Sequence, residues 1–99
     1  EGDEFICPTH TFTASAYPFI KKGAKPIWAD IDRDTRVVTL ETIKKVITAK
    51  TKAVVVVHLY GFIIPDIEKI AKFCKENNIL LIEDVAQALG TEINGKKAG

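Results

Sequence analysis

The fold expected of this sequence is decided by one stretch near its middle, Ala53-Val54-Val55-Val56-Val57. Valine is β-branched and favours strands, and four valines in succession leave the strand without a polar face. Such a strand is buried on both faces, which is typical of the interior of a parallel sheet covered by helices. We therefore expect a central strand over residues 52–58, ended by Tyr60-Gly61.

On both sides of this strand the sequence alternates between short apolar runs and segments that favour helix. The apolar runs predict strands over residues 5–8, 25–31, 79–82 and 89–93, the last entering a tight turn at Asn94-Gly95. The segments between them predict helices over residues 12–22, 40–48 and 65–76. Strands that alternate with helices form parallel sheets. We therefore expect an α/β fold with three layers, in which helices cover both faces of one parallel sheet.

Two residues affect where the predicted helices begin. Pro18 lies inside the first one, where a proline costs about 3 kcal/mol, so it either kinks that helix or shortens it to begin near Tyr17. Thr39 is expected to cap the second helix. Residue 42 is a threonine and not the Glu or Gln of a capping box, so we expect the cap alone.

Composition and short motifs argue against several classes of function. The chain has 14 basic and 13 acidic residues, a formal charge of +1, which gives no electrostatic basis for binding nucleic acid or an anionic membrane. No apolar run approaches the roughly 20 residues of a membrane span, and the first residues do not resemble a signal peptide. Cys7 and Cys74 form no zinc or redox motif and are expected to be reduced thiols of a cytoplasmic protein. The acidic run at residues 30–34 lacks the glycine and distal glutamate of a calcium loop, so we expect no metal site.

Asp84 is the strongest candidate for a functional residue. It follows the apolar run at residues 79–82, and in open parallel sheets ligands bind where the strands end. A carboxylate at the edge of an apolar core needs a partner, because an unpaired buried charge is costly. The residues themselves leave two partners open: the protonated ring nitrogen of a cofactor, or the backbone of the turn that begins at Val85, which Asp84 would cap in the manner of a helix N-cap.

Several runs of this sequence, in their order and spacing, resemble the DegT/DnrJ/StrS family of pyridoxal-phosphate-dependent sugar aminotransferases. The runs are Gly2-Asp3-Glu4, Pro8-Thr9, Thr11-Phe12-Thr13-Ala14-Ser15-Ala16, Gly23-Ala24-Lys25-Pro26, Thr48-Ala49-Lys50-Thr51-Lys52-Ala53, Val57-His58-Leu59-Tyr60-Gly61 and Glu83-Asp84-Val85-Ala86-Gln87-Ala88-Leu89-Gly90. The resemblance covers nearly the whole chain. It implies that residues 1–99 are an internal piece of the large, cofactor-binding domain of a fold-type-I transferase, with both termini truncated and no internal boundary.

The resemblance also assigns roles to residues that would hold pyridoxal 5'-phosphate. Asp84 would pair with the pyridine nitrogen, Gln87 would reach the ring hydroxyl oxygen, and Phe12 would stack on the ring. A place in the apolar core is the alternative for Phe12. Thr11 and His58 are secondary candidates, for which helix capping and strand-end packing are the respective alternatives.

The activity implied for the parent protein is transfer of an amino group from an amino acid, commonly glutamate, to a nucleotide-linked keto-sugar. Relatives are homodimers. The lysine that holds the cofactor covalently in the family lies downstream of this segment, and none of the lysines here matches it. We therefore expect no catalytic residue in this chain and no activity of the piece alone.

Three other functions stay open at this stage. One is a sugar dehydratase of the same family, in which a histidine replaces the covalent lysine. Another is a non-catalytic, regulatory relative. The third, a Rossmann-like nucleotide-binding module, is disfavoured because no G-x-G-x-x-G motif follows the first strand.

Overall fold

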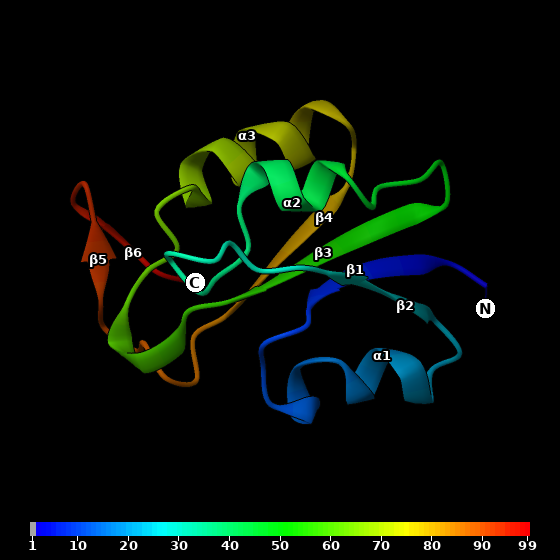
Figure 1. The fold of residues 1–99 in the computed structure, drawn as a ribbon, viewed down its shortest axis with the longest axis horizontal. Coiled ribbons are helices and arrows are strands. Elements are labelled where there is room, and N and C mark those ends of the chain that lie inside the picture. The colour runs from blue at the N-terminus through cyan, green and yellow to red at the C-terminus, as the bar shows by residue number, and fades with distance from the viewer. Residues whose placement is uncertain (1) are drawn as a thin grey trace.

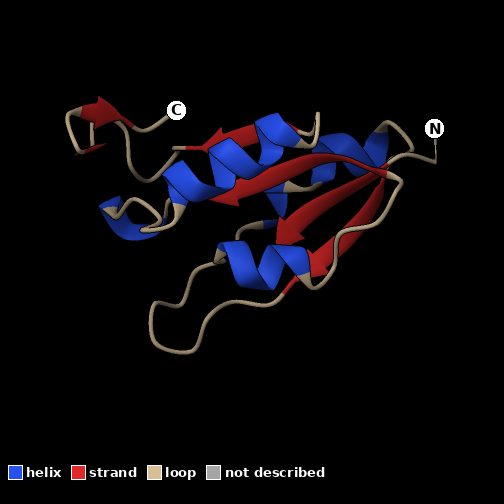
Figure 2. Cartoon of the chain, turned by 90° about the horizontal axis from the view of Figure 1, so that it is seen from above, coloured by secondary structure: helices blue, strands red, loops and turns tan. Residues whose placement is uncertain are grey.

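A four-stranded parallel sheet forms the centre of the chain in a computed structural model that describes residues 2–99 (Figure 1). The strands are β1 (Glu4–Pro8), β2 (Lys25–Ala29), β3 (Thr51–Val57) and β4 (Leu80–Asp84). They lie in the order β2-β1-β3-β4, and every neighbouring pair is parallel (Figure 2). The predicted α/β class is confirmed, and β3 is an interior strand as expected.

Helices cover both faces of the sheet, so the prediction of three layers is also confirmed. Helix α1 (Tyr17–Lys21) lies on one face, and α2 (Leu40–Lys44) and α3 (Ile67–Glu76) lie together on the other (Figure 1). Side chains of successive residues in a strand point to opposite faces. Val54 and Val56 therefore enter the larger core under α2 and α3, while Val55 enters the smaller core under α1.

The strand order creates a crevice between β1 and β3. After β1 the chain crosses by α1 to β2 on one side, and after β3 it crosses by α3 to β4 on the opposite side. Loops that leave neighbouring strands in opposite directions open a gap at the carboxyl ends of those strands, and ligands of open parallel sheets bind there. The loop after β1 and the ends of β3 and β4 therefore frame the expected place for a site.

The first predicted helix is wrong in extent. Residues 12–22 form a short 3₁₀ turn, η1 (Thr13–Ser15), followed by α1 from Tyr17 to Lys21. Pro18 lies in the first turn of α1, where its missing N–H has no helical partner to lose. The shortened helix that begins near Tyr17 is therefore the correct alternative.

The second helix is shorter than predicted and better capped. It ends at Lys44, not at Thr48, because Thr48 instead forms a turn in which its N–H donates to Thr51 Oγ1 at 3.0 Å. Thr39 Oγ1 accepts from the Thr42 N–H at 3.2 Å, and Thr42 Oγ1 accepts from the Thr39 N–H at 3.0 Å. The expectation of a cap without a capping box was wrong, because a threonine hydroxyl accepts the hydrogen bond that Glu or Gln normally accepts.

Two predicted strands are shorter than expected. Strand β2 stops at Ala29, and Asp32 then accepts hydrogen bonds from Asp34 N and Thr35 N in an exposed turn. The predicted strand at residues 89–93 is reduced to β5 (Glu92–Ile93), because Thr91 Oγ1 donates to Ala88 O and holds the preceding residues in turns.

The tight turn expected after this last strand is present. Strand β5 pairs in antiparallel fashion with β6 (Lys96–Lys97). The connecting residues Asn94 and Gly95 have φ values of 52° and 74°, the positive values that a two-residue hairpin turn requires.

Within residues 2–99, no helix is long and apolar enough to cross a membrane, and no cluster of three or more His, Cys, Asp or Glu side chains is arranged to hold a metal ion.

The capping box of α2 yields a prediction for stability. Substituting Thr39→Ala removes the hydroxyl that satisfies the Thr42 N–H, and we expect the free energy of unfolding to fall by about 1 kcal/mol. Thr39→Ser keeps an acceptor at this position and is expected to change it by a few tenths at most. Urea unfolding of the two variants measures the difference, and equal losses would show that the hydroxyl does not act as a cap.

Candidate functional site

Asp84 ends β4 and lies on the face of the sheet that α1 covers. It is paired with Val57 at the end of β3, and Ile82, two residues earlier on the same side of the strand, packs into the core under α1. The carboxylate therefore stands just beyond the apolar core, at the end of the crevice formed by the strand order.

Both oxygens of Asp84 are held by hydrogen bonds. Ser15 Oγ donates to Oδ2 at 2.7 Å, and the Ala86 N–H donates to Oδ1 at 3.0 Å. Ser15 Oγ lies 3.0 Å from Thr11 Oγ1. No helix follows Asp84, because residues 86–90 form turns, but Asp84 does cap the turn that begins at Val85, since its Oδ1 accepts from the Ala86 N–H. Capping therefore accounts for one oxygen of Asp84, and Ser15 holds the other.

A cavity of about 160 Å³ lies beside this carboxylate. Its wall includes four of the predicted cofactor-binding residues, together with neighbours from the same loops: Asp84, Gln87, Phe12, Thr11, Ser15, Ala14, Val57, Leu59 and Ala86. Phe12 is 74% exposed, so the alternative that it belongs to the apolar core is wrong. The structure thus brings together a carboxylate, an amide and an aromatic ring at one opening.

The amide of Gln87 has a defined orientation. Its Oε1 accepts a hydrogen bond from the Tyr60 N–H at 3.0 Å, so its NH₂ group is left as the donor for a ligand. Tyr60 presents this N–H from a left-handed backbone conformation with φ 57°, which is costly for a residue with a Cβ atom. Gln87 therefore offers hydrogen-bond donors to an acceptor oxygen in the cavity.

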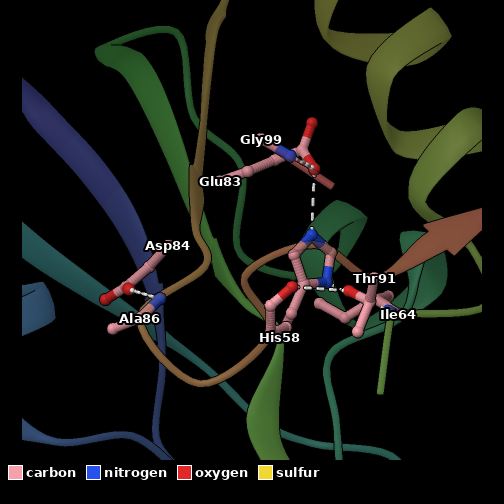
Figure 3. Close-up of polar contacts among 8 residues, drawn as sticks. His58, Ile64, Glu83, Asp84, Ala86, Thr91 and Gly99 are labelled. Carbon is pink, nitrogen blue, oxygen red and sulfur yellow. Dashed lines mark hydrogen bonds and ion pairs between the residues drawn. The ribbon is translucent and has the colours of Figure 1, made fainter. Parts of the chain in front are cut away.

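His58 is not brought to this group. It is fully buried, its Nδ1 accepts from the Ile64 N–H at 3.1 Å, and its Nε2 lies 2.9 Å from Glu83 Oε2. An Nδ1 that accepts a backbone N–H leaves the proton on Nε2, which donates to Glu83. The side chains of Glu83 and Asp84 leave the strand in different directions (Figure 3). These contacts fit the alternative given for His58 in the sequence analysis, which is packing and hydrogen bonding at the end of a strand.

Ser15 is the residue that the sequence analysis missed. It is 8% exposed and lies in η1, 69 residues from the carboxylate that it contacts. The only local signal is its place four residues after Thr11, a spacing that brings two side chains to one side of a helical turn.

Cys7 lies in β1 beneath the site, fully buried in the core under α1. Burial, and secondarily the negative charge of Asp84, raises the pKa of the Cys7 thiol to about 11. Burial also raises the pKa of Cys74. Both side chains are free thiols, as predicted.

Comparison with known proteins defines the family of this chain. The family model of the DegT/DnrJ/EryC1/StrS aminotransferase family matches residues 1–99. The chain belongs to this family. A GDP-perosamine synthase from Vibrio cholerae is 44% identical over 99 residues, which is 100% of this chain and 27% of that protein.

Solved structures of an aminotransferase and of a sugar dehydratase have the same fold as this chain. An aminotransferase from Psychrobacter cryohalolentis matches 97% of the chain with a TM-score of 0.91 and 40% identity, over 24% of its own length. An E. coli GDP-4-keto-6-deoxy-D-mannose-3-dehydratase with bound hydrated pyridoxal phosphate matches 100% of the chain with a TM-score of 0.89 and 32% identity, over 25% of its own length. The chain thus spans about a quarter of the length of these proteins.

The raised pKa of Cys7 predicts a loss of stability in alkaline solution. Between pH 9, the ordinary pKa of a thiol, and about 11, the unfolded state releases the Cys7 proton while the folded state keeps it. Stability contributed by the protonated thiol is therefore complete below pH 9 and falls as the pH rises through this window, by up to about 3 kcal/mol.

The measurement is the free energy of unfolding on either side of this window, compared with the same pair of values for Cys7→Ala. The variant is expected to show a shallower decline, whatever its absolute stability. Cys74→Ala removes only the contribution of the Cys74 thiol, whose pKa burial also raises, and it is expected to keep the part of the decline that Cys7 causes. An unchanged slope in Cys7→Ala would contradict the assignment.

Proposed function

We propose that residues 1–99 are part of the large, cofactor-binding domain of a pyridoxal-phosphate-dependent sugar aminotransferase. The observation that carries the proposal is the cavity beside Asp84, which gathers Gln87 and Phe12 from separate loops at the crevice between β1 and β3. Family relatives support the class of reaction, because a GDP-perosamine synthase and an enzyme with bound pyridoxal phosphate match the chain over its full length.

The groups around the cavity fit the chemistry of this cofactor. Asp84 is an acceptor for a protonated ring nitrogen, Gln87 offers an NH₂ donor to an oxygen on the ring, and Phe12 exposes a flat aromatic face. When bound, pyridoxal phosphate supplies an electron-withdrawing ring that stabilises negative charge on the substrate carbon that loses its proton.

Each residue has a distinct task in this proposal. Asp84 holds the ring nitrogen in its protonated form through a charge-assisted hydrogen bond, which is shorter and stronger than a neutral one. Gln87 orients the ring by its oxygen, and Phe12 limits its tilt by stacking. Thr11 lies at the edge of the cavity, and His58 supports the site from the opposite face by holding the end of β3 against β4.

The substrates in this proposal are an amino-acid donor, glutamate, and a nucleotide-linked keto-sugar that receives the amino group. The covalent lysine belongs to a part of the protein outside residues 1–99, so the 99-residue piece is inactive by itself. We further propose that the whole protein is a cytoplasmic homodimer. The apolar face of α3 is buried in the core, and the balanced charge of the chain gives no electrostatic basis for binding a membrane or nucleic acid.

Dehydration of a nucleotide-linked sugar is the second candidate, favoured by the similarity to the E. coli dehydratase. Mass spectrometry of the sugar product from the full-length protein separates the two reactions. The transaminated sugar has gained an amino group in place of a carbonyl oxygen, whereas the dehydratase product has lost a hydroxyl oxygen and gained no nitrogen.

We expect Asp84→Asn in the full-length protein to weaken cofactor binding by about 10- to 100-fold, because a hydrogen bond to a charged group contributes about 1.5–3 kcal/mol. Gln87→Glu keeps an acceptor for the Tyr60 N–H but loses the NH₂ donor, so it is also expected to weaken binding. Titration with pyridoxal phosphate, followed by the absorbance of the bound cofactor, measures both effects.

Asp34→Asn is the matched control, since it makes the same chemical change at an exposed carboxylate in the turn after β2. It is expected to leave cofactor affinity and sugar amination unchanged. If Asp84→Asn bound the cofactor as tightly as the Asp34→Asn control, the proposed function would be wrong.

A further inference from the structure

We propose that Ser15 is the positioning residue of this site, and that its hydroxyl fixes the Asp84 carboxylate in the orientation that receives the protonated ring nitrogen. This inference rests on the proposed function, because it concerns how the same carboxylate meets the same cofactor. It adds Ser15 to the residues of the proposed cofactor site, because Ser15 contacts Asp84 across 69 residues of sequence.

The direction of the hydrogen bonds follows from the chemistry of the groups. A carboxylate only accepts, so the Ser15 hydroxyl must use its proton on Asp84 Oδ2 across the 2.7 Å contact. Ser15 Oγ is then available as the acceptor for the Thr11 hydroxyl, 3.0 Å away. The result is a directed chain from Thr11 through Ser15 to Asp84.

Two donors from different parts of the chain fix the plane of the carboxylate. The Ala86 N–H binds Oδ1 from the turn that follows β4, and Ser15 binds Oδ2 from η1. A carboxylate has about four acceptor positions, so two of them stay available for a ligand while rotation of the group is restricted. An acceptor that is already oriented loses less conformational entropy when a ligand binds.

Ser15 is itself held in place. It is nearly buried, its N–H donates to Phe12 O at 3.1 Å, and the next residue donates from its N–H to Thr13 O at 3.1 Å. The 3₁₀ turn that presents the ring of Phe12 to the cavity is therefore the same element that holds Ser15 against Asp84. One turn thus sets both the stacking face and the carboxylate that meets the edge of the cofactor ring.

The decisive experiment is a double-mutant cycle in the full-length protein. We expect Ser15→Ala to weaken binding of pyridoxal phosphate by about 2- to 12-fold, because the Asp84 side chain must then lose its rotational freedom when the cofactor binds. In the Asp84→Asn background the same substitution is expected to weaken binding by less than about twofold, because the charge that Ser15 orients is absent. Ser15→Thr, which keeps a hydroxyl, is expected to restore most of the affinity.

A purely structural role for Ser15 gives a different result. Thr39→Ala removes a hydroxyl and lowers stability on the opposite face of the sheet, so it reports the effect of destabilisation on cofactor binding. Equal losses of affinity for Ser15→Ala with and without Asp84→Asn, or a loss no larger than that of Thr39→Ala, would overturn the inference. If Asp84→Asn weakens binding and Ser15→Ala does not, only the role of Ser15 fails. If Asp84→Asn has no effect, the proposed function fails.

Discussion

Burial of β3 on both faces is the constraint on which the rest of this structure depends. Residues 53–57 are all buried, and a strand without a polar face is stable only when apolar layers cover it on both sides. Helices α2 and α3 supply one layer and α1 supplies the other. The crossovers that place these helices also determine the strand order, and the strand order produces the crevice beside β3. The position of the candidate site is therefore a consequence of how the central strand is covered.

The site is assembled from segments that are far apart in the sequence. Asp84 comes from the end of β4, Phe12 and Ser15 come from the loop after β1, and Gln87 is oriented by the backbone of Tyr60 after β3. None of these loops has a regular helix at the cavity. Their geometry is fixed instead by hydrogen bonds between loops. Ser15 binds the carboxylate of Asp84, and the Tyr60 N–H binds the amide of Gln87.

The sequence was sufficient to predict features that depend on local pattern. The valine run identified the interior strand. The carboxylate after a buried strand singled out Asp84 as a candidate, and the family resemblance added Gln87 and Phe12, which line the same cavity. The extents of the helices were less predictable, because Pro18 and Thr48 act through local geometry that a hydrophobic pattern does not contain. Ser15 was not predictable in this way, since its significance comes from a contact across 69 residues of sequence. The face on which His58 lies follows from its position after Val57, but its partner Glu83 emerged only from the packing of β3 against β4.

The adjacent carboxylates at the end of β4 have a consequence for the evolution of this segment. Because neighbouring residues of a strand point to opposite faces, Glu83 meets the buried His58 while Asp84 meets the cavity. A one-residue slip in the register of β4 turns each side chain to the other face. In one direction it places Glu83 beside Val57 at the cavity and Ile82 beside Val56, and in the other it places Asp84 beside Val56 and Val85 beside Val57. The first slip takes the Glu83 carboxylate away from the buried His58, and the second leaves an apolar side chain at the cavity and the shorter carboxylate near His58. Either displacement therefore alters the cavity and also costs stability. Single-residue insertions and deletions in β4 are therefore disfavoured twice, once by folding and once by function.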